Sequence, residues 1–243
     1  MKIFTYATYF MFSVVMLAGL RELFGIVFTF VSVFICFILI KKDIGAIVKL
    51  NTLLFPLVIV YLISLAFLSR SGQDVSSGVT INAFSIYNIF TYVSLNVILV
   101  FGSMLKITKD MSDKQVYISV LLSGLVFSLL IVSQILILSH AHITNFSMPL
   151  LDIASENKLV YIFTLVVTFL AMISSYLSST YSLYAKIKVK QDGDFYLVLI
   201  VIAMLIASFL GFAKIVQLSY ILLGFMSLIL VFYICFTRFI KCN

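Results

Sequence analysis

The sequence predicts an all-α polytopic membrane protein with eight transmembrane helices, on three observations. Hydrophobic residues make up 63% of the 243 residues and charged residues only 10%, against roughly a quarter charged in soluble domains. Eight uncharged stretches of 18 to 31 residues follow one another along the chain, each long enough to cross a hydrocarbon core of about 30 Å as a helix. The Lys and Arg residues gather between these stretches.

The predicted spans form a single transmembrane domain. They cover residues 3–20, 23–40, 50–69, 83–105, 115–139, 159–185, 195–213 and 215–237. The first is longer than the apolar region of a typical secretion signal, so we interpret it as a span. The fourth uncharged stretch opens with Ser76, Ser77 and Gly78, which are loop residues, so its helix is expected to start near Ala83.

The distribution of positive charge predicts the orientation. With eight spans both termini lie on the same side, and that side holds 12 of the 16 Lys and Arg residues. The other side holds only Arg21, Arg70, Lys158 and Lys214. The positive-inside rule therefore places both termini in the cytoplasm. The short segments at Arg21–Glu22 and at Lys214 are predicted to be outer loops.

The longest predicted outer loop covers residues 140–158. It contains a second apolar patch, Met148-Pro149-Leu150-Leu151. Four consecutive apolar side chains would be exposed to water in an open loop. We therefore expect a short helix here that lies over the outer mouth of the protein.

Several function classes are disfavoured by the composition. The net charge of +7 arises from cations in short loops, where they orient a membrane protein, so nucleic acid is excluded as a partner. No Asp, Glu, Lys, Arg or His lies inside a predicted span, which argues against an enzyme. The three cysteines and two histidines show no metal-binding spacing.

A stripe of polar side chains lies on the fourth predicted span. Its members fall within an arc of about 80° on a helix: Ser85, Asn88, Tyr92 and Asn96. Two asparagine amides in one apolar span are costly to desolvate unless they meet partners. The stripe predicts either a face that lines a watery cavity or hydrogen bonds between helices.

Hydroxyl side chains crowd the sixth predicted span. They are Thr164, Thr168, Ser174, Ser175, Ser178, Ser179, Thr180 and Ser182. Hydroxyl oxygens are ligands that a hard cation such as sodium accepts. Serines also permit close helix packing and bond back to a carbonyl one turn earlier. An ion site and a packing role are both open from the sequence.

Six short segments carry a resemblance to a known family. They are VMLAG at 15–19, LNTLLFPL at 50–57, YVSLN at 92–96, MPLL at 148–151, LGFAK at 210–214 and YILLG at 220–224. In this order and spacing they resemble the YkvI-type family of bacterial membrane proteins. That family is related to the amino acid–polyamine–organocation transporters, which have the leucine-transporter fold.

The resemblance implies a core of ten helices in two inverted repeats, of which this chain supplies helices three to ten and lacks the first two. The fourth span is then helix six, with Tyr92, Ser94 and Asn96 beside the substrate. Together with Asn88 of the stripe, these are the candidate solute ligands. Ser174 and Ser175 match a pair of hydroxyl residues that ligate sodium in that family.

The function that this resemblance implies is a symporter, a sodium-coupled carrier of a small amino-acid-like solute, in the plasma membrane of a bacterium. Sodium is the one candidate ion, and no other cofactor is expected. The expected partners are the lipid bilayer, the solute, and partner helices that replace the missing pair. The alternative function is an inactive or partner-dependent membrane protein with an interaction or regulatory role.

Overall fold

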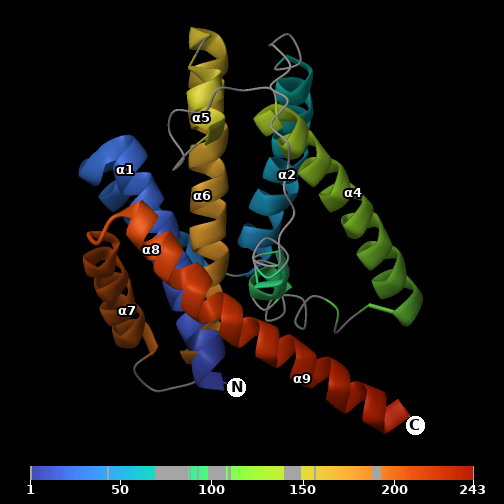
Figure 1. Ribbon diagram of the computed structural model, residues 1–243. Helices are drawn as coiled ribbons and strands as arrows, with labels where there is room; N and C mark the ends of the chain where they lie inside the picture. Colours follow the sequence, from blue (N-terminus) through green and yellow to red (C-terminus); the bar gives the residue numbers. More distant parts are fainter. Residues whose placement is uncertain are drawn as a thin grey trace. The chain divides into compact units, whose positions relative to one another are not determined.

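The described part of the chain is helical almost throughout in a computed structural model (Figure 1). The structure describes residues 2–42, 44–68, 87, 89–91, 93–97, 108, 111–139, 149–155, 157–187 and 193–242. These ranges contain no strand, and five of their helices are long and apolar enough to cross a membrane. The prediction of a helical membrane protein is confirmed at this level. The count of eight spans and the inverted-repeat arrangement stay predictions.

The chain divides into two compact units. Unit 1 comprises Met1–Ile44, Thr80–Ile107 and Ser175–Asn243, and unit 2 comprises Gly45–Val79 and Thr108–Ser174. Helix α6 (Lys158–Ile187) contributes its first part to unit 2 and its second part to unit 1. Each unit is described by itself below.

Helix α1 (Lys2–Lys42) in unit 1 folds back on itself at Gly25. Ser13 contacts Ser179 of α6, while Lys41 reaches Tyr184 of the same helix through Asp194. Ser13 and Lys41 would be about 42 Å apart on a straight helix, whereas the two α6 positions are separated by only about 8 Å. Gly25 has φ 80° and ψ 173°, a conformation that is open essentially only to glycine. We refer to residues 2–24 as the first limb and residues 26–42 as the second limb.

Helix α7 (Gly193–Ser208) runs antiparallel to the second limb of α1. The Arg21 guanidinium lies 4.6 Å from the ring centroid of Phe209, just after α7 ends. At the opposite end, Lys41 pairs with Asp194. A turn at residues 209–211, with Gly211 at φ 94°, then leads to α8 (Phe212–Ser219).

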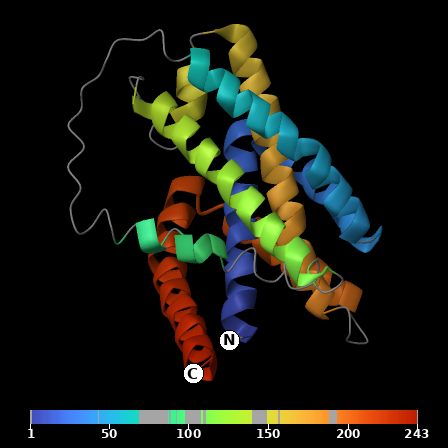
Figure 2. The same cartoon turned by 90° about the vertical axis from the view of Figure 1, so that its right-hand side faces the viewer.

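The last predicted span is one continuous helix that contains a π-helical turn. Helix α8, the π-helix η3 (Tyr220–Gly224) and α9 (Phe225–Cys242) follow one another without a turn (Figure 2). A π-helical turn inside a helix is rare and frequently marks a functional site.

Two predicted loop positions are corrected by the structure. Arg21 and Glu22 are helical, and the chain turns at Gly25 instead. Lys214 is also helical and belongs to α8, while the preceding turn lies at residues 209–211. The prediction places each loop at a charged side chain, but the backbone turns where glycine permits a positive φ. Each charge lies within about one helical turn of that glycine.

Unit 2 is built from α2 (Ile44–Leu68), α4 (Asp113–Ser139), α5 (Pro149–Ala154) and the first part of α6. Helix α4 begins with a capping box, in which the Ser112 amide donates to Gln115 Oε1 at 2.9 Å and the Gln115 amide donates to Ser112 Oγ at 3.4 Å. The Asn157 side chain caps α6 by accepting from the Leu159 amide at 3.0 Å. Helix α2 begins six residues before the predicted span.

An apolar cluster joins the helices of unit 2 at one end. Its buried members are Tyr61, Leu62 and Leu65 of α2, Ile137 of α4 and Val167 of α6. Leu150 and Ile153 of α5 pack against it. The short helix that the sequence predicts in the 140–158 loop is therefore present over residues 149–154. The cluster brings together the ends of α2, α4 and α6 that the sequence places on the outer side.

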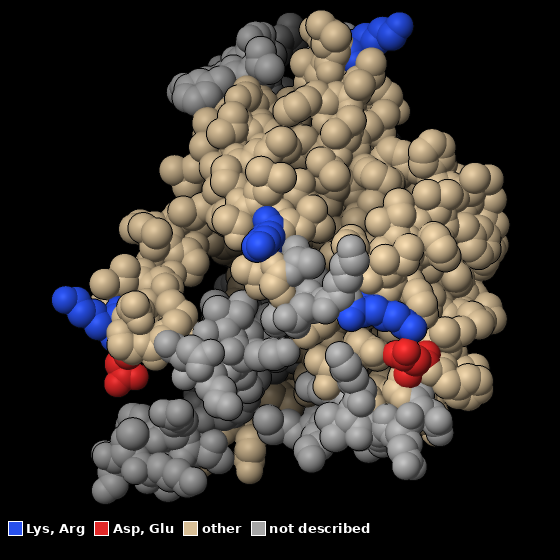
Figure 3. All heavy atoms as spheres, turned by 180° about the vertical axis from the view of Figure 1, so that it is seen from behind, with Lys and Arg blue, Asp and Glu red and all other residues tan. Residues whose placement is uncertain are grey.

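Charged groups are few on the face of the described part that Figure 3 shows. Figure 3 shows isolated blue and red groups on a tan surface. Large apolar side chains of α4 are exposed along most of its length, including Leu122 at 63% and Leu125 at 70%. Such a surface is stable in contact with lipid rather than with water.

Candidate functional site

Helix α6 pairs with α2 through two hydrogen-bonded contacts in unit 2. The Tyr61 hydroxyl lies 2.7 Å from Thr164 Oγ1, and the Ser174 hydroxyl donates to Asn51 Oδ1. The partners are ten residues apart on each helix and run in opposite directions, so α2 and α6 are antiparallel. The two contacts are separated by about 15 Å along the helices.

In unit 1 the same helix pairs with the first limb of α1 through hydroxyl groups. Ser13 Oγ lies 2.7 Å from Ser179 Oγ and 3.2 Å from Thr180 Oγ1. All three residues are buried. The Tyr176 ring is also buried and lies near Thr180, but its hydroxyl makes no hydrogen bond of ordinary geometry with the described residues. This hydroxyl cluster carries no charge.

The two predicted sodium ligands have different surroundings. The Ser174 side chain is held by Asn51. Ser175 is half-buried, and its carbonyl oxygen accepts a hydrogen bond from Ser179 Oγ at 2.8 Å. Because consecutive helical residues point about 100° apart, the two side chains face different directions. An ion bound at the Ser174 hydroxyl would have the Asn51 amide oxygen as a further ligand.

The candidate solute ligands are described in part. Ser94 is buried, and Asn96 is half-buried and makes a polar or ring contact of its own. Asn88 and Tyr92 lie outside the described residues. The described buried residues of this segment are Thr91, Ser94 and Leu95, and Asn96, the one member of the predicted stripe that the structure describes, is only half-buried.

The segment around Thr91 packs against the π-helix η3. A Cβ atom added at Gly224 would lie 3.2 Å from Thr91 Cβ and 3.5 Å from the Thr91 carbonyl oxygen. The absence of a side chain at Gly224 therefore permits this close approach. Thr91 itself donates to the Tyr87 carbonyl at 3.1 Å.

Two buried hydroxyls flank η3 without partners. Ser219 Oγ and Ser227 Oγ are shielded from solvent, and neither has a hydrogen bond within the described ranges. Ser13, Ser133 and Ser179 instead bond back to a carbonyl of their own helix. For Ser227 the carbonyl four residues earlier, that of Leu223, belongs to the π-helical turn. Both hydroxyls keep hydrogen-bonding capacity in the buried part of the last span.

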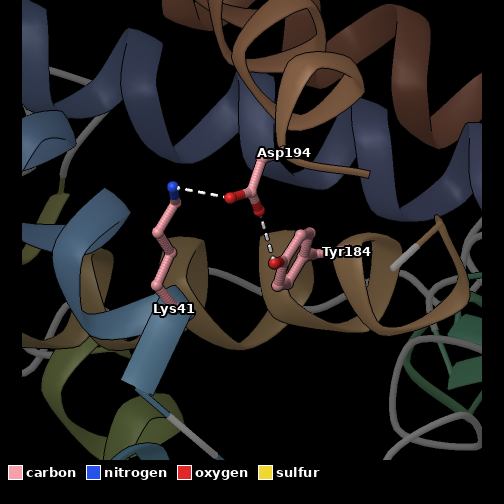
Figure 4. A network of polar contacts seen from close by, with 3 residues as sticks. All are labelled: Lys41, Tyr184 and Asp194. Atoms are coloured by element: carbon pink, nitrogen blue, oxygen red, sulfur yellow. Dashed lines mark hydrogen bonds and ion pairs between the residues drawn. The ribbon is translucent and has the colours of Figure 1, made fainter. Parts of the chain in front are cut away.

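A polar network ties three helices together at one end of unit 1 (Figure 4). Lys41 Nζ lies 2.9 Å from Asp194 Oδ2, and the Tyr184 hydroxyl donates to Asp194 Oδ1 at 2.7 Å. Lys41 Nζ also lies 5.0 Å from the ring centroid of Phe37. The second limb of α1, α6 and α7 thus meet around one carboxylate.

Sequence reasoning missed the partners of the α6 hydroxyls. Ser13 and Tyr61 are not among the predicted site residues, and Asn51 is predicted only within a segment that carries the resemblance. The sequence holds one signal for Ser13, because Tyr9 and Ser13 stand four residues apart and so share a face of the predicted span. The pairing itself crosses 166 residues and leaves no local signal.

Comparison with known proteins adds no assignment. No protein-family model matches the chain, and no curated protein or solved structure matches it. Within the described residues, no group of three or more His, Cys, Asp or Glu side chains is placed to hold a metal ion.

Proposed function

We propose that this protein is a secondary carrier for a small amino-acid-like solute, driven by sodium. The observation that supports this best is the π-helical turn η3, flanked by the buried hydroxyls of Ser219 and Ser227 and packed against the segment that contains Ser94. Irregular backbone within the membrane is tolerated where protein or a cavity satisfies its polar groups, and carriers place their sites at such points.

The proposed solute site lies in unit 1. Ser94 and Asn96 supply its described polar groups, and Asn88 and Tyr92 complete it in the proposal. Neutral hydroxyl and amide groups suit a zwitterionic or amide-like solute, since they donate and accept hydrogen bonds without a net charge.

The proposed sodium ligands are Ser174 and Ser175. Uncharged oxygen donors suit a hard monovalent cation. In the structure the Ser174 hydroxyl points its proton toward Asn51. Bound sodium would instead face the lone pairs of both oxygens, so the hydroxyl has to rotate on binding.

The experiment measures solute-induced thermal stabilisation of the detergent-purified chain with amino acids and related amines, with and without sodium. A ligand that binds only the folded state stabilises it by about 2.7 kcal/mol at a concentration of 100 times its Kd. We expect Ser94→Ala to remove the solute-dependent shift. Ser175→Ala is expected to remove the dependence on sodium.

A matched control separates binding from helix packing. Ser128 on α4 is exposed and bonds only to its own helix, at the Gly124 carbonyl. Ser128→Ala should leave both shifts unchanged. A folded, monodisperse protein that shows no shift with any solute would overturn the carrier proposal.

A partner-dependent membrane role is the second candidate, and helix α4 is the observation that favours it. A Cβ atom added at Gly124 would meet no other atom within 4 Å, and the apolar side chains around it are exposed. Small residues on an exposed helix face permit close approach of another helix. If the protein has a partner-dependent role, Gly124→Ile should abolish co-purification of the partner. If the protein is a carrier, Gly124→Ile should leave carrier activity unchanged.

We further propose a plasma-membrane location in a bacterium with both termini in the cytoplasm. The 12 to 4 division of Lys and Arg supports this orientation. The fold-back of α1 also agrees with it, because both ends of that helix lie at one end of unit 1.

A further inference from the structure

An apolar groove runs between the second limb of α1 and helix α7, within unit 1. Its volume is about 580 Å³. The buried side chains of Val33 and Val201 form its floor. Exposed side chains form its walls, namely Phe30 and Phe34 from the limb and Val198 and Ile202 from α7. The groove therefore opens outward from unit 1.

One end of the groove holds the ion pair of Lys41 and Asp194. Phe37 lines the groove, and Lys41 Nζ lies 5.0 Å from the centroid of that ring. Lys41 pairs with Asp194, yet its side chain is 41% exposed. An ammonium group has three donors, so donors remain for a second anion while the pair with Asp194 persists.

The groove and the lysine beside it together have about the length of one bilayer leaflet. The lining of the limb runs from Phe30 to Phe37, about 10 Å on a helix, and Lys41 lies one helical turn further on. From Phe30 to Lys41 the distance is about 16 Å, and half of a hydrocarbon core is about 15 Å thick.

We propose that this groove binds one anionic glycerophospholipid, with an acyl chain along the phenylalanine and valine side chains and the phosphate at Lys41. Complementarity selects this occupant, because the partly exposed Lys41 ammonium keeps donors for a phosphate while it pairs with Asp194, and the lining of the groove is apolar. The site does not depend on the proposed carrier function.

The chain contains no tryptophan, so a single introduced tryptophan reports on one place. In Phe34→Trp the indole lies in the wall of the groove. We expect a phosphatidylglycerol with brominated acyl chains to quench its fluorescence with about fivefold preference over the brominated phosphatidylcholine. One lysine contact near a charged headgroup contributes a factor of this size.

Two further variants identify the phosphate contact. Adding Lys41→Gln to Phe34→Trp should remove the preference for phosphatidylglycerol. Adding Asp194→Asn to Phe34→Trp breaks the same network but keeps the lysine, so the preference should remain. Phe127→Trp on the exposed surface of α4 is the control for ordinary lipid contact, and both brominated lipids should quench it equally.

Three results would overturn the proposal. Equal quenching of Phe34→Trp by the two lipids would mean that the groove is ordinary lipid-facing surface. Absence of quenching by either lipid would mean that protein covers the groove. A preference that survives Lys41→Gln would place the phosphate elsewhere.

Discussion

At the scale of single residues, two glycines determine where the described helices turn. Gly25 and Gly211 are the described residues with positive φ, at 80° and 94°. No atom lies within 4 Å of a Cβ added at either position. A side chain there would therefore meet no steric obstacle from its neighbours, and the whole penalty would come from the backbone conformation.

We predict that Gly25→Ala lowers the free energy of unfolding by about 1–3 kcal/mol, the usual strain of an L-residue in this region. Thermal unfolding in detergent measures the effect. Gly45→Ala is the control, because Gly45 is helical and also has open space around it. That variant should be neutral or slightly stabilising, since alanine has the higher helix propensity. Equal destabilisation by both variants would contradict the role given to Gly25.

The hydroxyl pair of Ser13 and Ser179 is the second test at this scale. We predict a coupling energy of about 0.6 kcal/mol, and at most about 1.7 kcal/mol, in a double-mutant cycle with Ser13→Ala and Ser179→Ala. The free energy of unfolding in mixed micelles is the measured quantity. Additive effects would show that the 2.7 Å contact between the two hydroxyl oxygens contributes nothing to stability.

At the scale of elements, the sequence predicts helices well and their partners poorly. The predicted spans at 115–139 and 159–185 agree within two residues with α4 and α6, because long apolar runs bounded by polar caps are local signals. Pro56 lies inside α2. The π-helix η3 has no sequence signal. Which hydroxyls meet across helices depends on packing, so Asn51 and Ser13 could not be assigned as partners in advance.

The contact between Gly224 of η3 and Thr91 gives a prediction about how two helical elements pack. Gly224→Val should destabilise the protein by about 1–3 kcal/mol, because the added side chain would overlap Thr91. Gly124→Val on α4 has the same chemical change in open space and is expected to have little effect on stability. Thermal unfolding of the two variants compares them directly. If Gly224→Val is as stable as Gly124→Val, the segment around Thr91 does not pack against η3.

At the scale of the whole molecule, successive helices alternate in direction within each of the two units. In unit 1, Lys41, Tyr184 and Asp194 meet at one end, while Arg21 and Phe209 meet at the other. In unit 2, the late residues of α2 and α4 meet the early residues of α6. Both patterns are those expected of a chain that crosses a membrane repeatedly, and both agree with the predicted order of inner and outer ends.

Cysteine accessibility tests this orientation in intact cells. In a background without Cys36, Cys235 and Cys242, Ser155→Cys should react with a membrane-impermeant maleimide from outside. Asp113→Cys should react only after the membrane is opened. Ser155 follows α5 and Asp113 begins α4, and both are exposed. Reversed reactivity would place the termini outside the cell.

The single-residue turn at Gly25 leaves no spare chain between the two limbs of α1. In the folded protein neither limb can therefore move far along the membrane normal without carrying the other with it. Residues 2–42 act in the bilayer as one paired element rather than as two independent helices.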